Sequence, residues 1–343
     1  MAGRHLPPEA RIQNPLLPTG EGARVIQFLD VVLPVFGLIA IGYAARRLGI
    51  LSAAAGEGIS EFVFTFAISV LLFRTVATAD LGGVSPWRIW AAYYGGIAVV
   101  WLVAHAVMRR AFGRDARGAV VGGVSAAFAN TVLIGLPFVQ QIYDDSGVVV
   151  ALVIISIHTP VIMVSALLMH DWALRTDGIA EEAAGPGRAL LHLAAELVRN
   201  PVIVGILAGV LWRGLGLPLA GPVGEIVDAL ARTAGPLALV ASGIGLARYG
   251  LRGRFGQASA MAGLKLLLLP GVVLALGMAL GLPPLAIEVT TLVAACPTGV
   301  NAFILASRFR TGEALASTVM TLSTAFALVT MIGWLAVLRA VLG

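Results

Sequence analysis

Residues 293–309 have the sequence VAACPTGVNAFILASRF, which begins and ends like a buried apolar helix. Its middle holds Pro297, Gly299 and Asn301, three residues that such a helix should avoid. Proline removes a backbone donor and clashes with the preceding turn, so it frees carbonyl groups that a regular helix would bond. The stretch therefore predicts a helix that is broken near its centre.

The composition of the whole chain predicts a membrane protein. Of its 343 residues, 59% are hydrophobic and only 12% are charged, and the mean hydropathy is +0.94. Soluble domains carry about 25% charged residues. Because an apolar excess of this size is covered only by lipid, we expect an all-α integral membrane protein.

Ten apolar segments approach or exceed the length needed to cross a bilayer, which is about 20 residues. They cover residues 25–45, 56–78, 87–108, 118–142, 147–171, 200–217, 227–248, 257–281, 285–307 and 313–340. The predicted organisation is a polar N-terminal tail, a first five-helix repeat, a cytoplasmic loop and a second five-helix repeat, at residues 1–24, 25–172, 173–199 and 200–343.

The arginines orient these segments. Most of them lie in the odd-numbered connections, whereas the even-numbered connections hold only Arg74, Arg88 and Arg213. Since basic residues collect in cytoplasmic loops, the odd connections are predicted to face the cytoplasm and both termini to lie outside. The excess of 23 basic over 18 acidic residues is therefore no sign of nucleic-acid binding.

The two halves of the chain resemble one another. A shift of 167 residues places Pro34 over Pro201 and Asn130-Thr131 over Pro297-Thr298, although coincidence in a biased composition is the alternative. Five segments per half is an odd number, so the second half would enter the membrane with the opposite orientation. Inverted repeats of this kind are typical of secondary transporters, whose substrate sites lie near the midplane on discontinuous helices.

The fourth segment contains a second candidate break. Its stretch AAFANTVLIGLPFVQQ has Asn130, Gly135 and Pro137 in its interior. Non-helical backbone at membrane depth is tolerated only inside protein or beside a water-filled cavity. We therefore expect broken helices 4 and 9 to cross and satisfy one another, leaving helix ends that can hold an ion or a carboxylate. A simple proline kink in each helix is the alternative.

At these residues the chain resembles the auxin efflux carrier family, which has bacterial members and includes the plant PIN carriers. FANTVLIGLP resembles the family motif N-T-x-x-x-G-x-P, and CPTGVNAFILASRF resembles its P-x-G-x-x-x-F-x-x-A pattern. The resemblance implies a ten-helix carrier in the bacterial cytoplasmic membrane. It would move small organic anions, such as malate, malonate or auxin-like acids, by alternating access. Asn130, Pro137 and Pro297 fall on the crossing motifs.

The candidate site combines both breaks with one charged residue. Lys265, the only lysine, lies within the eighth segment, where it could attract a substrate anion or extend to the cytoplasmic head groups. His158 lies in mid-segment and is either a structural histidine or a proton-coupling one, since imidazole titrates near physiological pH. The predicted substrate-binding residues are Asn130, Thr131, Pro137, Pro297, Thr298, Gly299, Asn301 and Lys265.

The sequence predicts no cofactor and no metal site; its single cysteine, Cys296, excludes an intramolecular disulfide and leaves no spacing for a cysteine metal site. A coupling proton or sodium ion stays open, and so does a coupled symporter of similar fold with another substrate. An intramembrane enzyme is disfavoured, since the chain lacks H-E-x-x-H and G-x-S-x-G motifs and paired aspartates within a segment. The expected partners are a small organic anion and the lipid bilayer, without nucleic acid, and a homodimer is left open.

Overall fold

The computed structural model describes residues 21–78, 85–179, 200–249 and 255–343. The predicted tail up to residue 20 and most of the predicted cytoplasmic loop lie outside the described residues. Within these ranges the chain is helical, and the one pairing of strand type is an isolated bridge between two residues.

The helices and turns follow one another along the chain without a sheet. They are α1 (Glu21–Arg47), α2 (Ala53–Phe62), η1 (Val63–Ala67), α3 (Ile68–Thr78), α4 (Pro86–Arg110), α5 (Ala116–Ala127), η2 (Thr131–Gly135), α6 (Leu136–Thr176), α8 (Pro201–Gly214), α9 (Gly221–Tyr249), α10 (Phe255–Gly263), η4 (Leu264–Leu268), α11 (Leu269–Ala279), α12 (Pro284–Ala295), α13 (Asn301–Arg308) and α14 (Glu313–Leu342). The η elements are single π-helical turns that continue directly into their neighbours. Helix α6 has non-helical backbone angles at Asp144, where the sequence predicts the boundary between two segments.

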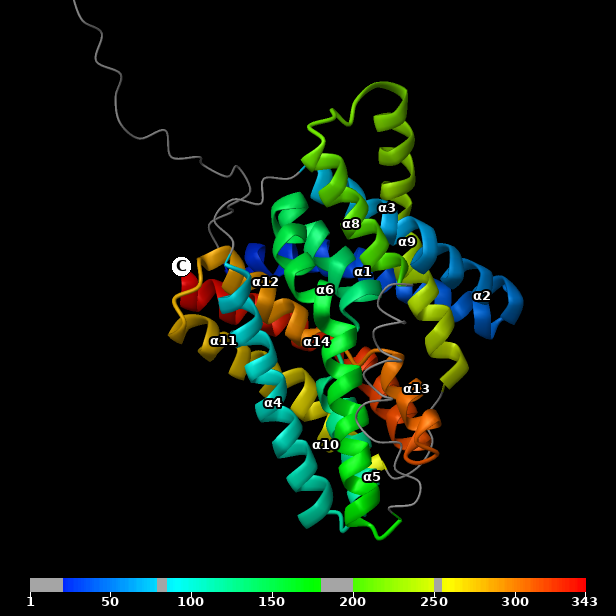
Figure 1. Ribbon diagram of the computed structural model, residues 1–343, viewed down its shortest axis with the longest axis vertical. Coiled ribbons are helices and arrows are strands. Elements are labelled where there is room, and N and C mark those ends of the chain that lie inside the picture. Colours follow the sequence, from blue (N-terminus) through cyan, green and yellow to red (C-terminus); the bar gives the residue numbers. More distant parts are fainter. Residues whose placement is uncertain (1–20, 79–84, 180–199, 250–254) are drawn as a thin grey trace, which may run out of the picture.

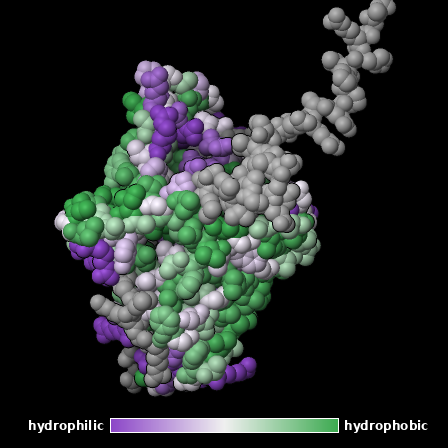
Figure 2. Space-filling view, turned by 180° about the vertical axis from the view of Figure 1, so that it is seen from behind, coloured by the Kyte–Doolittle hydropathy of each residue, from purple (hydrophilic) through white to green (hydrophobic). Residues whose placement is uncertain are grey.

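The length and hydropathy of the helices indicate that the chain crosses the membrane several times. Six helices within the described ranges are long and apolar enough to span it, and α8 and α12 are apolar but shorter. Figure 2 shows hydrophobic side chains across the middle of one face and hydrophilic ones gathered toward its ends. The prediction of an all-α membrane protein is confirmed, whereas six spanning helices are fewer than the ten predicted segments. Breaks and short helices account for three of the four missing spans, since α8 and α12 are apolar but too short and the fourth segment is interrupted before Thr131; the fourth missing span is α1, part of which lies outside the described side chains.

The helices pack in two groups (Figure 1). In the first group, α1, α2 and α3 pack against α9, and α3 also packs against α8. The second group contains α4, α5, α6 and the helices from α10 to α14, with α4 against α5 and α11 and with α12 against α6 and α11. Both candidate breaks lie in the second group.

Glycines allow the backbones of α1 and α9 to touch in the first group. A Cβ atom added at Gly243 would collide with the carbonyl oxygen of Ile39, and one added at Gly42 would collide with that of Val240. Because these neighbours are main-chain atoms, they cannot move aside without shifting a whole helix.

Gly243→Ala is expected to lower the thermal unfolding temperature of the purified protein, because the added methyl group pushes α1 away from α9. Overpacking of this kind costs about 1–3 kcal/mol. Gly245→Ala is the matched control, since no atom lies within 4 Å of the added Cβ. Alanine also loses less backbone entropy than glycine in a helix, so the control should be neutral or slightly stabilised. Equal unfolding temperatures for the two variants would contradict this packing.

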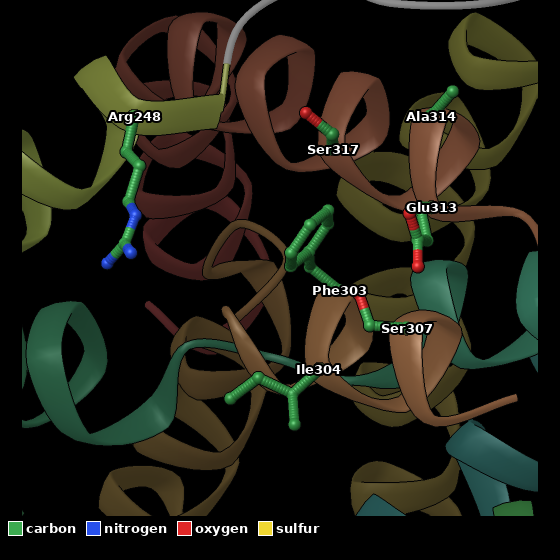
Figure 3. Close-up of a pocket in the computed structure, with 7 residues that line it drawn as sticks. All are labelled: Arg248, Phe303, Ile304, Ser307, Glu313, Ala314 and Ser317. Atoms are coloured by element: carbon green, nitrogen blue, oxygen red, sulfur yellow. The ribbon is translucent and has the colours of Figure 1, made fainter. Parts of the chain in front are cut away.

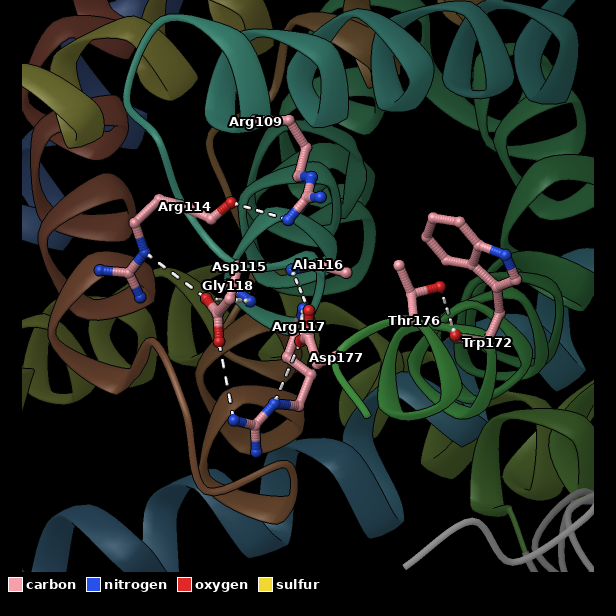
Figure 4. Close-up of polar contacts among 9 residues, drawn as sticks. All are labelled: Arg109, Arg114, Asp115, Ala116, Arg117, Gly118, Trp172, Thr176 and Asp177. Carbon is pink, nitrogen blue, oxygen red and sulfur yellow. Dashed lines mark hydrogen bonds and ion pairs between the residues drawn. The ribbon is translucent and has the colours of Figure 1, made fainter. Parts of the chain in front are cut away.

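Two carboxylates hold the start of α5, the helix that leads into the first break (Figure 4). Asp115 accepts a hydrogen bond from the Gly118 backbone at 3.2 Å, and Asp177 accepts from the Ala116 and Arg117 backbones at 2.9 and 3.1 Å. Burial alone would raise the pKa of Asp177. The backbone donors of Ala116 and Arg117, together with the Arg117 side chain, outweigh this effect and lower the pKa. The stabilisation by Asp177 is therefore complete at neutral pH and is lost only as the pH falls through the lowered value.

Candidate functional site

The two helix breaks lie against one another. One separates α5 from η2 and the other separates α12 from α13. The backbone N–H of Asn130 donates to the Pro297 carbonyl at 2.8 Å, and the N–H of Gly299 donates to the Phe128 carbonyl at 2.9 Å. Each break therefore satisfies backbone groups that the other leaves without a helical partner.

Small and polar side chains make this close approach possible. A Cβ at Gly299 would lie 3.3 Å from the Ala129 carbonyl oxygen, so a larger residue would press the two breaks apart. The Thr298 hydroxyl donates to the Ser125 carbonyl at 2.8 Å, and the Ser323 hydroxyl lies 3.0 Å from the Thr298 backbone N–H, which donates to it. The second break is thus tied to both α5 and α14.

Asn130 connects the breaks to the first helix group. Its side-chain oxygen accepts a hydrogen bond from the Leu133 backbone at 3.2 Å and so caps η2. Its amide nitrogen donates to the Ser242 hydroxyl on α9 at 3.3 Å. Because an amide nitrogen has two hydrogens, this group can donate one more hydrogen bond.

A cavity of about 140 Å³ lies beside Asn130, between the two helix groups. Since a water molecule takes about 30 Å³ in the liquid, this volume suits a few waters or a small organic acid. None of its described lining residues is acidic, and Arg248 is the cationic one. The polar side chains around it are Ser60, Asn130, Ser242, Arg248, Thr298 and Thr324.

Arg248 also lines a wider cavity of about 710 Å³. In Figure 3 its guanidinium stands on one side, opposite Phe303 and Ser307 of α13, with Ser317 of α14 above them. Arg248 donates a hydrogen bond to Glu57 at 2.9 Å, and both side chains are mostly exposed. The two cavities therefore adjoin at an accessible arginine.

A second set of ion pairs joins the helices at a distant point. Arg74, near the end of α3, pairs with Asp228 on α9 and with Asp145 on α6, the latter at 3.3 Å. Glu57 precedes Arg74 by 17 residues on the same continuous helix, which corresponds to about 25 Å. The Arg74 pairs and the Arg248 pair thus lie at opposite ends of the α2–α3 helix, and the Arg74–Asp145 pair links the two groups.

Comparison with known proteins identifies the family of this chain. Residues 27–335 match the model of the family described as "Membrane transport protein". The chain belongs to this family. It is a membrane transporter, not an enzyme, and the resemblance to auxin efflux carriers is confirmed.

Three relatives of this transporter align over most of their own length. An "Uncharacterized transporter" of Methanothermobacter thermautotrophicus is 28% identical over 316 residues, which is 90% of this chain and 98% of the relative. The "Putative malonate transporter" of Rhizobium meliloti is 25% identical over 92% of this chain and 97% of its own. "Auxin efflux carrier component 8" of Arabidopsis thaliana is 24% identical over 86% of this chain and 94% of its own.

Lys265 of the transporter does not line the cavity. It sits in η4, fully buried, and its Nζ donates to the Ala294 carbonyl at 2.6 Å in the last turn of α12. A cation at the C-terminal end of a helix interacts favourably with the helix dipole. The complete burial of Lys265 leaves no exposed ammonium group that could reach lipid head groups.

His158 is buried behind the first break. It is 1% exposed, and its ring centroid lies 5.0 Å from that of Phe128 and 5.6 Å from that of Tyr93. Neither ring nitrogen has a hydrogen bond of good geometry within the described residues. The imidazole therefore contacts the break from the protein interior and does not line the cavity.

The other predicted residues lie either at the two breaks or in the helices that follow them. Thr298 lines the cavity, whereas Thr131 is buried at the start of η2 and Asn301 begins α13. Pro137 lies beyond the first break, in the first turn of α6, where a missing backbone donor is tolerated because the preceding π turn changes the bonding pattern. The sequence predicts neither Arg248 nor Ser242 as a site residue, because Arg248 belongs to the odd-numbered connection after residues 227–248, which is predicted to be cytoplasmic.

Proposed function

We propose that this transporter is a carrier of small carboxylate anions that works by alternating access. The observation that carries the proposal is the cavity beside Asn130, which combines an arginine and an amide donor with no acidic residue among its described lining. Relatives named for malonate and for auxin efflux support an organic anion as the substrate.

The proposed binding mode divides two tasks between two residues. The Arg248 guanidinium neutralises the charge of the anion at the junction of the two cavities. The Asn130 amide then donates a hydrogen bond to one carboxylate oxygen, with the Ser242 hydroxyl beside it. Pro297, Thr298 and Gly299 hold the second break in the shape that leaves room for the ligand.

We also propose that the chain consists of two inverted five-helix repeats, at residues 25–172 and 200–343. Close contacts that obey the 167-residue shift support this arrangement. A Cβ at Gly42 would meet the Val240 carbonyl, and one at Gly209 would meet the Phe73 carbonyl at 2.8 Å. Gly42 corresponds to Gly209 and Phe73 to Val240, so each half makes the same contact with the other.

The orientation follows from the arginine distribution of the sequence. With both termini outside, the Arg248 cavity opens toward the cytoplasm and the ion pairs of Arg74 lie at the outer side. In the proposed cycle, the Arg74–Asp145 pair keeps the outer path closed while the inner cavity is accessible. Opening of the outer path would require these pairs to separate.

Uptake into proteoliposomes tests the proposed function. Labelled malonate, malate and indole-3-acetate should be compared with an uncharged amide of the same size, with proton and sodium gradients imposed separately. We expect saturable uptake of at least one carboxylate and none of the amide, since only the carboxylate pairs with Arg248. The gradient that accelerates uptake identifies the coupling ion. If that ion is the proton, His158 is the proposed site that carries it. Equal uptake of amide and acids would overturn an anion carrier.

A further inference from the structure

A cationic pocket of about 610 Å³ lies at the turn between α4 and α5, apart from the substrate cavity. Its polar lining consists of His105, Arg109, Arg110 and Arg114, and Leu102 lies at its apolar side. Among the residues that the structure describes, no carboxylate lines this pocket.

Local contacts shape the pocket and, among the described residues, leave two of its three arginines without an ion pair. Arg109 donates to the Arg114 carbonyl at 3.0 Å, which holds the turn closed (Figure 4). Asp177 pairs with Arg117, and Asp115 lies 3.7 Å from Arg117 and 3.9 Å from Arg114. These carboxylates also cap the start of α5. Within the described part of the chain, Arg109 and Arg110 form no ion pair.

An exposed apolar stripe runs along α4 toward the pocket. Val99 is 43% exposed and Leu102 is 66% exposed, and both share a helix face with Arg109. The distance from Leu102 to Arg109 along the helix axis is about 10 Å. Helix α4 is one of those long and apolar enough to span the membrane. The pocket therefore lies where the apolar surface of this helix ends.

An aromatic ring marks the same level. Trp172, near the end of α6, is 47% exposed, and its ring centroid lies 5.6 Å from that of His105. Tryptophan is enriched at the boundary between lipid tails and head groups. The arginine pocket thus lies at head-group depth, next to a surface suited to an acyl chain.

We propose that this pocket binds the phosphate of an anionic phospholipid whose acyl chains lie along Leu102 and Val99. Guanidinium groups recognise phosphate oxygens through paired hydrogen bonds, and basic pockets at the cytoplasmic ends of spanning helices suit anionic head groups. Free phosphate would use the arginines but would gain nothing from the apolar stripe.

Native mass spectrometry of the purified transporter, titrated with phosphatidylglycerol, tests the proposal. In the Arg109→Gln/Arg110→Gln variant, affinity for the lipid should fall about 30-fold, as expected for two charges near an anionic head group. Leu102→Ser should also weaken lipid binding, because it interrupts the stripe. Phosphatidylcholine should bind weakly, and inorganic phosphate at a concentration equal to that of phosphatidylglycerol should not displace the lipid.

The matched control is Arg46→Gln/Arg47→Gln, which removes the same arginine pair from the end of α1. The cavity lined by Arg46 also contains Glu57, so this variant should keep the affinity for phosphatidylglycerol. Unfolding temperatures measured without added lipid show that each variant is folded. Equal losses in both arginine variants, equal binding of phosphatidylcholine, or displacement by an equal concentration of inorganic phosphate would each overturn the proposed lipid site.

Discussion

Asn130→Ala is expected to weaken binding of the transported carboxylate about 10- to 150-fold. The Asn130 side chain lines the cavity, and its amide nitrogen already donates to Ser242. A hydrogen bond to a charged group contributes about 1.5–3 kcal/mol, which corresponds to the stated loss of affinity. Equilibrium binding of the labelled acid to the purified protein measures the effect.

Asn130→Ser separates this binding role from the capping role. The asparagine oxygen caps η2 by accepting from Leu133, and serine can cap a helix in the same way. Asn130→Ser should therefore keep the unfolding temperature near that of the wild type while losing most of the affinity. If Asn130→Ala lowered only the unfolding temperature and left affinity intact, Asn130 would be a structural cap alone.

Arg248→Gln is expected to weaken anion binding by about 10- to 100-fold, because it removes the positive charge among the described lining of the cavity. Arg248→Lys should keep part of the affinity, since it keeps the charge but loses the paired donors of the guanidinium. Arg232→Gln is the control, because it removes an exposed arginine of α9 that does not line the cavity. Uptake and equilibrium binding at low ionic strength measure the difference.

Glu57→Gln tests whether the ion pair between Glu57 and Arg248 competes with binding of the anion. Glu57 holds the Arg248 guanidinium at 2.9 Å, so the carboxylate of the substrate competes with it. Without this competitor, affinity for the anion should stay the same or rise. A loss of affinity in Glu57→Gln as large as that in Arg248→Gln would show that the ion pair, and not the free guanidinium, supports binding.

The sequence predicts the second break well because its cause is local. Pro297 lacks a backbone donor, and glycine at position 299 carries no Cβ, which would lie 3.3 Å from the Ala129 carbonyl oxygen. The first break is placed less well: Gly135 and Pro137 fall within continuous helix, and the interruption lies just before Thr131. A helix can absorb a proline near its start, so composition by itself does not locate the interruption.

Hydropathy, the broken helix at Pro297 and the family resemblance were determined by the sequence itself, because each depends on residues that are neighbours in the chain. The partners of charged groups were decided only by the tertiary structure. Arg74 meets Asp228 across 154 positions, Lys265 turns to the Ala294 carbonyl, and Arg248 reaches the cavity beside Asn130. A buried or half-buried charge takes the partner that packing brings within a few ångströms, and no local pattern in the sequence specifies that partner.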